Sequence, residues 1–169
     1  HDPSRVGLVW LNSPSNPTGR VLPVEHLRKV VDWARERGAV VASDECYGEF
    51  GWDAEPTSVL HPEINEGRHD GLLALHSLSK RSNVAGYRAG FVAGDRGVVA
   101  DLLLIRKHAG MLVPRPVQEV MIDLLGDDDH VAQQRDVGAA GQAVAVHLRD
   151  RRLVHVEQHH AQALHALEL

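Results

Sequence analysis

The sequence predicts an α/β fold of three layers, in which a mostly parallel, mixed sheet carries helices on both faces. Three short apolar runs, residues 6–11, 39–42 and 72–75, lack the alternation of half-exposed strands, which is typical of parallel strands covered on both faces. A helical pattern over residues 23–37 separates the first two runs, and Gly38 provides a stop signal. Together these features predict a right-handed β-α-β unit.

The elements that follow are predicted in chain order. Residues 47–70 contain two prolines and several glycines, which indicates a loop with a short helical turn near residues 57–60. The apolar run 87–94 follows the third strand after about ten residues, which is short for a parallel crossover and favours an antiparallel strand. A helix is then expected over residues 95–109, with its apolar side chains turned inward: Val98, Val99, Leu102, Leu103 and Ile105. A second helix is expected after Pro116.

Length and composition narrow the class of protein. With 169 residues, 43% of them apolar and 24% charged, the chain has the composition of an ordinary globular domain. A net charge of −5 without a basic block argues against nucleic acid as a partner. No apolar run approaches the roughly 20 residues of a membrane span. The single cysteine, Cys46, and the absence of a secretory signal predict a cytoplasmic location.

Residues 1–129 and residues 130–169 differ in amino-acid composition. The chain opens on His1 and enters an apolar run at once, so we expect that further sequence precedes it. Residues 130–169 have few large apolar side chains and hold six of the twelve histidines, which predicts at best a marginal helix or disorder. A shifted reading frame is one hypothesis for this tail, which translation of the other two frames would test. No metal site is predicted, because the histidines lack a carboxylate or cysteine partner at a known spacing.

Polar residues follow each of the three predicted parallel strands. Asn16 follows the first, Asp44 and Tyr47 the second, and Lys80 the third. In open α/β sheets ligands bind at the carboxyl ends of the strands, so these residues are expected to converge. Hydroxyls precede Lys80 and Arg88 follows it, and such a setting is typical of a lysine that holds an aldehyde cofactor.

The motifs resemble those of class I and II aminotransferases, the pyridoxal-phosphate enzymes of fold type I. The matching pieces are Asn16-Pro17-Thr18-Gly19, Asp44 with Tyr47, Ser77-Leu78-Ser79-Lys80, and Arg88, and the similarity runs over residues 6–125. The resemblance implies that residues 1–129 are part of the cofactor-binding large domain. It also implies a homodimer in the full-length protein, with amino-acid and 2-oxo-acid substrates.

The resemblance assigns the central chemistry to Lys80 and Asp44. Lys80 would bond to the cofactor aldehyde and then carry the proton that leaves the substrate's α-carbon, which requires a depressed pKa from burial and nearby positive charge. Asp44 would pair with the pyridine nitrogen. Taken alone, a strand-end aspartate is more simply a turn cap, and a lysine in a loop is more simply solvated.

By the same resemblance, the remaining residues would hold the cofactor's oxygens. Arg88, Ser77 and Ser79 would bind the phosphate, for which a guanidinium fork is suited. Asn16 and Tyr47 would donate to the phenolate oxygen. Each also has a structural alternative: a serine can cap a turn, an asparagine can form an Asx-turn, and a tyrosine can simply pack.

Within the family the motifs look most like those of bacterial succinyldiaminopimelate aminotransferases of lysine synthesis. The substrates would then be N-succinyl-diaminopimelate and glutamate. Two alternatives stay open: a carbon–sulfur β-lyase on the same scaffold, and a truncated fragment without activity. A sheet that lacks neighbouring strands would also expose an apolar edge, so low solubility or oligomers are expected.

Overall fold

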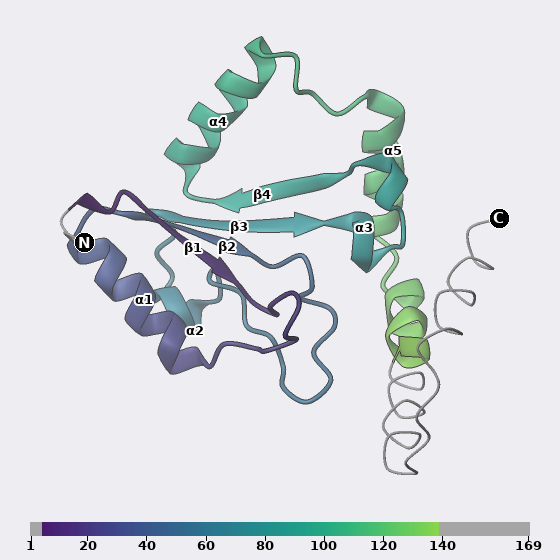
Figure 1. Ribbon diagram of the computed structural model, residues 1–169. Coiled ribbons are helices and arrows are strands. Elements are labelled where there is room, and N and C mark those ends of the chain that lie inside the picture. The colour runs from purple at the N-terminus through teal and green to yellow at the C-terminus, as the bar shows by residue number, and fades with distance from the viewer. Residues whose placement is uncertain (1–4, 139–169) are drawn as a thin grey trace. The chain divides into compact units, whose positions relative to one another are not determined.

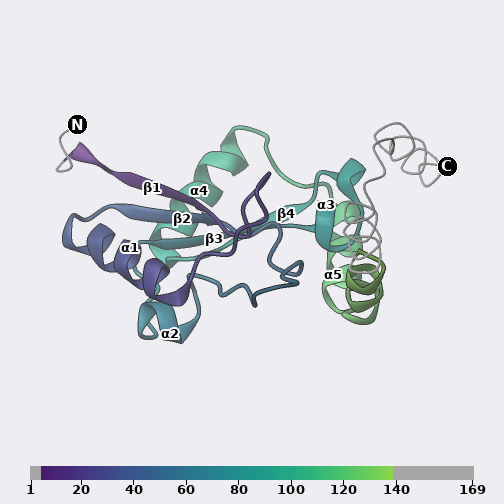
Figure 2. The same cartoon turned by 60° about the horizontal axis from the view of Figure 1, so that its bottom comes forward.

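The computed structural model describes residues 5–138, and their central feature is a four-stranded sheet in the order β1-β2-β3-β4 (Figure 1). Strands β1 (Leu8–Asn12), β2 (Val40–Asp44) and β3 (Leu72–Ser77) are parallel, and β4 (Gly90–Gly94) runs antiparallel to β3. Helices α1 and α2 lie on one side of the sheet and α4 on the other (Figure 2). The predicted mixed α/β architecture is therefore confirmed.

Helix α1 (Val24–Glu36) provides the crossover between β1 and β2, as its apolar spacing predicts. It ends before Gly38, whose φ of +63° is a backbone conformation that glycine adopts without strain. Its buried face packs on the sheet and forms the core with residues from β2, β3 and the loop between them: Leu27, Val31, Ala34, Val41, Val59, Ile64, Leu72 and Ala74.

Two boundaries differ from those predicted. Between β2 and β3, the helical turn is the short helix α2 (Pro62–Asn65), a few residues beyond the predicted position. It begins there because His61 accepts a hydrogen bond from the Glu63 backbone and Pro62 occupies the first turn. After the four-residue helix α3 (Leu78–Arg81), a 3-10 turn η2 (Ala85–Tyr87) delays the start of β4 to Gly90.

Helices α4 (Arg96–His108) and α5 (Arg115–Leu125) form where the sequence predicts them. Asp95 caps α4 by accepting hydrogen bonds from Gly97 and Val98. The predicted inward apolar face of α4 is wrong for the described residues, because none of its side chains is buried. Its leucines and Ile105 are exposed because no described element covers them.

Sheet edge β1 is exposed as well. Trp10 is 58% exposed and Leu8 is 55% exposed, so the prediction of a strand covered on both faces is wrong for β1. The cause is its position, since β1 is the edge strand of the described sheet and pairs only with β2 there. The expected apolar edge is thus present.

Of the described residues, 5–132 form one compact unit and 133–138 belong to a second. Residues 129–138 are helical, so a helix forms where only a marginal one was predicted. Asp127 caps it by accepting hydrogen bonds from the amides of Asp129 and His130. Most of the predicted atypical tail, residues 139–169, lies outside the described residues, and the domain division stays a prediction. Within residues 5–138, no helix is long and apolar enough to cross a membrane.

Candidate functional site

The carboxyl ends of three parallel strands meet at one edge of the sheet. Asn12 at the end of β1 is aligned with Asp44 at the end of β2, and Asp44 is aligned with Leu75 of β3. The loop after β1, the loop after β2 and helix α3 therefore start side by side. This is the convergence that the sequence predicts from the order of its motifs.

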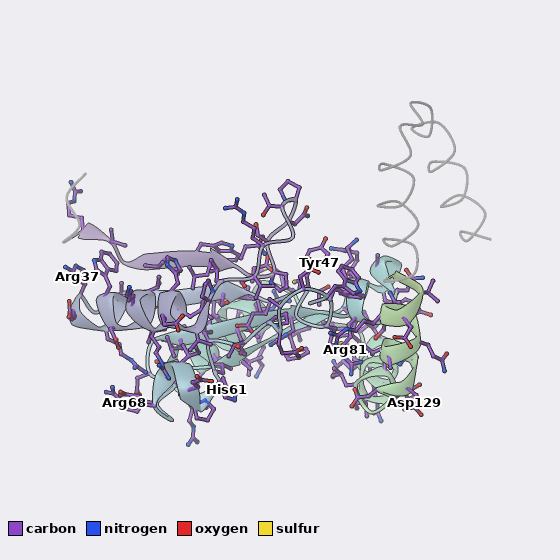
Figure 3. The ribbon with its side chains drawn as sticks, turned by 90° about the horizontal axis from the view of Figure 1, so that it is seen from below. Arg37, Tyr47, His61, Arg68, Arg81 and Asp129 are labelled. Atoms are coloured by element: carbon purple, nitrogen blue, oxygen red, sulfur yellow. The ribbon has the colours of Figure 1, made fainter. Side chains whose placement is uncertain are left out.

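Hydrogen bonds connect the first two of these segments. The Asn12 side chain donates to the Asp44 carbonyl over 3.3 Å, and the Ser13 amide donates to the same oxygen over 3.1 Å. The Asn12 carboxamide oxygen in turn accepts from the Asn16 amide over 2.8 Å, which shapes the loop. As a result Asn16 Nδ2 lies 3.4 Å from the hydroxyl of Tyr47, which Figure 3 labels. The two residues that the resemblance assigns to one cofactor oxygen are thus in contact.

Asp44 belongs to the face of the sheet opposite to α1. Alternate residues of a strand share a face, so Asp44 shares its face with Ala42, whereas Val41 packs toward α1. One Asp44 carboxylate oxygen accepts a hydrogen bond from the Cys46 amide over 3.2 Å. Burial and this carboxylate raise the pKa of the Cys46 thiol to about 12. The thiol is therefore protonated at neutral pH, in line with an inert cysteine.

Helix α3 carries Lys80 and begins directly at the end of β3. Ser77 is its N-cap, since the Ser77 hydroxyl accepts from the Ser79 amide over 3.1 Å. Leu78 is fully buried and anchors the helix, while Lys80 is exposed. The burial expected of Lys80 is therefore not observed among the described residues. The reason is the open face on which Asp44 lies, where Trp10 is also exposed.

Arg88 reaches the same edge through the antiparallel pairing of β3 with β4. Ser77 is aligned with Gly90, and the Leu78 amide donates to the Ala89 carbonyl over 3.1 Å. Arg88 precedes Ala89 and has a φ of +52°, in the left-handed region that closes η2. Its guanidinium is exposed and donates to the Ala85 carbonyl over 3.0 Å. The Arg88 backbone is therefore close to the predicted serine ligands at the end of β3, although Arg88 is separated from them in sequence by η2.

Glu45 is a residue of this edge that sequence reasoning missed. Its side chain is 5% exposed, and one oxygen accepts from the Val59 amide over 2.9 Å. The other oxygen lies 3.6 Å from Nε2 of His76, whose ring stacks on Phe91 at 4.9 Å between centroids. The sequence gives one indication of this position. Glu45 lies an even number of residues after Val41, so strand alternation places both side chains on the α1 side of the sheet. That pattern does not predict its partner, Val59.

A cavity of about 460 Å³ opens beside Glu45, His76 and Phe91. Among the described residues, Ser77 is the one predicted site residue that lines it. The cavity is on the α1 side of the sheet by the parity of Glu45 and His76, whereas Asp44 faces the other way. It therefore opens on the other face of the sheet and adjoins the predicted cofactor edge at Ser77.

Comparisons with known proteins identify the family. The family model described as aminotransferase class I and II matches residues 1–164. A probable aminotransferase of Mycobacterium tuberculosis is 66% identical over 134 residues, which cover 79% of this chain and 32% of that protein. The 4-dedimethylamino-4-oxo-anhydrotetracycline transaminase of Streptomyces rimosus is 61% identical over 131 residues, with 78% and 36% covered.

A solved structure shares the fold. The probable N-succinyldiaminopimelate aminotransferase of Thermus thermophilus aligns with a TM-score of 0.72 at 25% identity, over 79% of this chain and 36% of that one. The chain thus spans about a third of the length of these relatives. It belongs to the class I and II aminotransferase family.

Proposed function

We propose that this chain provides the cofactor lysine and its partners in a pyridoxal-phosphate-dependent aminotransferase. The family depends on this cofactor. The observation that carries the proposal is the contact between Asn16 and Tyr47 beside Asp44, at the edge where α3 presents Lys80. Three separate segments of the chain are needed to build that arrangement.

The chemistry of the donor set fits the cofactor. A phosphate needs cationic and hydroxyl donors. Ser77 and Ser79 offer hydroxyls at the start of α3, and Arg88 offers a guanidinium at the end of η2. A pyridine nitrogen that stays protonated needs a carboxylate, and Asp44 is the half-buried carboxylate of this edge. An aldehyde needs an amine, which Lys80 supplies. The assignments of these residues are proposals that rest on this complementarity.

The bound cofactor would supply an electron sink for the charge that develops at the substrate's α-carbon. The chain's own side chains would hold the cofactor and move the proton. Asp44 would hold the ring nitrogen as a cation, Asn16 and Tyr47 would donate hydrogen bonds to the phenolate oxygen, and Lys80 would move a proton to and from the α-carbon.

For the substrate, we propose N-succinyl-diaminopimelate with glutamate as the amino donor. The support is the likeness of the motifs at residues 12–19, 43–47, 77–83 and 106–111 to enzymes of that specificity, together with the fold shared with the Thermus thermophilus protein. The 61% identical Streptomyces rimosus transaminase is named for a tetracycline intermediate. An oxo-tetracycline acceptor is therefore the competitor to include in a substrate assay.

The test uses the three lysines of the chain, Lys29, Lys80 and Lys107. We expect added pyridoxal phosphate to give an absorbance near the visible that borohydride bleaches, and peptide mapping to find the adduct on Lys80. Lys80→Ala abolishes the signal, whereas Lys107→Ala, at the exposed end of α4, preserves it. Equal labelling of all three lysines would refute the assignment.

A second assay separates the reactions. Transfer of an amino group to a 2-oxo acid supports transamination, whereas release of pyruvate from cystathionine supports a β-lyase. Absence of both, with Lys80 still labelled, supports a fragment that binds cofactor without turnover. The homodimer and the cytoplasmic location stay predictions from the resemblance and from the single cysteine.

A further inference from the structure

Helix α3 is too short to fix the direction of Lys80 by itself. It comprises four residues and a single backbone hydrogen bond closes it, from the Ser82 amide to the Leu78 carbonyl over 3.0 Å. Isolated helical turns are unstable in water, because their nucleation cost exceeds the gain of one hydrogen bond. The backbone from which the Lys80 side chain projects therefore depends on what anchors the residues on either side of it.

Before Lys80, the anchors are local. Leu78 is fully buried, and the Ser77 hydroxyl caps the first turn. Both act at the start of the helix and belong to the end of β3. They leave the end of the helix, where Lys80 lies, to be held by the residues that follow it.

After Lys80, the anchors are distant in sequence and most of them reach residues 124–130. Arg81 Nη1 donates to the Leu124 carbonyl over 2.7 Å, and Nη2 is hydrogen-bonded to the carboxylate of Asp128. The Ser82 hydroxyl lies 3.0 Å from Nε2 of His130. Figure 3 labels Arg81 near the helical segment that carries Asp129. Two successive residues thus join α3 to one segment.

Arg81 is well placed for such a role. Its side chain is 13% exposed, although it carries a permanent charge. Its Nε also lies 3.4 Å from the Glu49 carboxylate, in the loop after β2. The Leu124 carbonyl belongs to the last turn of α5, where carbonyls lack a helical partner and attract cations. One guanidinium therefore joins three separate segments directly beside Lys80.

We infer that Arg81 and Ser82 are positioning residues for Lys80, and that they act by clamping the last turn of α3 to residues 124–130. This inference rests on the proposed role of Lys80, but the clamp itself is a property of the chain. The clamp fixes the backbone from which the Lys80 side chain projects. Without it, Lys80 samples more directions and meets the cofactor aldehyde in the reactive geometry less often.

The first test measures the clamp without cofactor. Hydrogen exchange of the Ser82 amide reports opening of the α3 turn, and Arg81→Met is expected to speed it about tenfold or more. Arg81→Lys keeps the charge but not the planar fork, so an intermediate rate is expected. The control Arg115→Met removes an arginine that is 87% exposed and pairs with Glu119 on α5. Exchange of the Val41 amide, which donates to Gly71 in the sheet, reports global unfolding and should stay unchanged.

The second test measures capture of pyridoxal phosphate. Condensation joins the Lys80 nitrogen to the aldehyde carbon and releases water, and borohydride then fixes the adduct. In Arg81→Met the rate at Lys80 is expected to fall about tenfold, relative to the rate at Lys107 in the same sample. Asp128→Asn gives a smaller fall and keeps the fold, since Asp128 is 89% exposed.

The outcomes separate the two proposals. If Ser82 exchange in Arg81→Met and Asp128→Asn equals that of Arg115→Met, the clamp is refuted even when the parent captures the cofactor. If exchange accelerates while no variant or parent labels Lys80, the clamp stands and the proposed function fails. If exchange accelerates and labelling of Lys80 in Arg81→Met equals the parent's, the clamp does not position Lys80, and the inference is overturned.

Discussion

Replacement of Glu45 by alanine removes the acceptor that ties the loop before α2 to the end of β2. The Val59 amide donates to this carboxylate over 2.9 Å, and Val59 is fully buried. The variant leaves that donor without a partner in the core. Hydrogen bonds to charged groups contribute about 1.5–3 kcal/mol, and an unmatched buried donor costs a similar amount, so we expect a loss of about 2–3 kcal/mol.

Thermal unfolding followed by circular dichroism measures this loss. For a chain of this size each kcal/mol corresponds to about 2–4 °C, so Tm should fall by about 4–12 °C. Glu45→Gln retains an oxygen acceptor and should lose less than Glu45→Ala. The matched control is Glu36→Ala, which breaks an exposed pair with Arg37 and should cost less than about 1 kcal/mol.

The reasoning would be refuted by a Glu45→Ala protein that melts within about 2 °C of the parent. Such a result would mean that the Val59 amide finds another partner, or that the loop is not held by this bond. A fall in the Glu36→Ala control equal to that of Glu45→Ala would also contradict it, since Glu45 is buried and holds a buried amide, whereas Glu36 is exposed.

Three further predictions concern the sheet and its edges. Gly94→Ala should lower Tm far more than Gly7→Ala. A Cβ at Gly94, whose φ is +134°, would lie 2.0 Å from the Leu72 carbonyl oxygen, whereas a Cβ at Gly7 would meet nothing within 4 Å. Equal Tm values for the two variants would contradict this prediction. The amides of Gly71 and Val98 lower the pKa of Asp95 below 3.8, so its carboxylate stabilises the fold above that pH and less as the pH falls through the lowered pKa. Asp95→Asn should therefore lower Tm at neutral pH, with a gap to the parent that narrows in acid, and a gap that does not change with pH would argue against it. Finally, the exposed edge of β1 should cause the protein to sediment as oligomers, and Trp10→Lys should shift it toward the monomer. A parent protein that sediments as a clean monomer would overturn this expectation.

The elements that the sequence predicts well are those whose signals are local. The spacing of Leu27, Val31 and Ala34 defines the buried face of α1, and Gly38 ends it. The antiparallel direction of β4 follows from the short connection after β3, because chain length limits the crossover. In each case the physical cause lies within one segment, so no knowledge of distant residues is needed.

The anchors of the site could not be predicted, because each joins segments far apart in the chain. Glu45 meets Val59 across the loop that follows β2, and Arg81 meets Leu124 across β4 and two helices. Arginine and glutamate are common surface residues. Strand alternation places Glu45 on the α1 side but does not reveal its partner, and nothing in the local sequence distinguishes Arg81. The exposure of Lys80 was missed for a related reason, since burial depends on elements that pack over a site and not on the motif that carries it.

The arrangement of the candidate site follows from strand order more than from any one motif. The strands lie in the sheet in the order in which they occur in the chain, so the loops that carry Asn16, Asp44 and Lys80 are neighbours. Adjacent strands are about 4.8 Å apart, and the three loops therefore span about 10 Å, the width of a substituted aromatic ring with its polar groups. A planar ligand laid across this edge would meet an amide, a carboxylate and an amine in sequence order. Had β3 paired with the other edge of β1, Lys80 would be separated from Asp44 by a further strand, and the same motifs could not act on one ring.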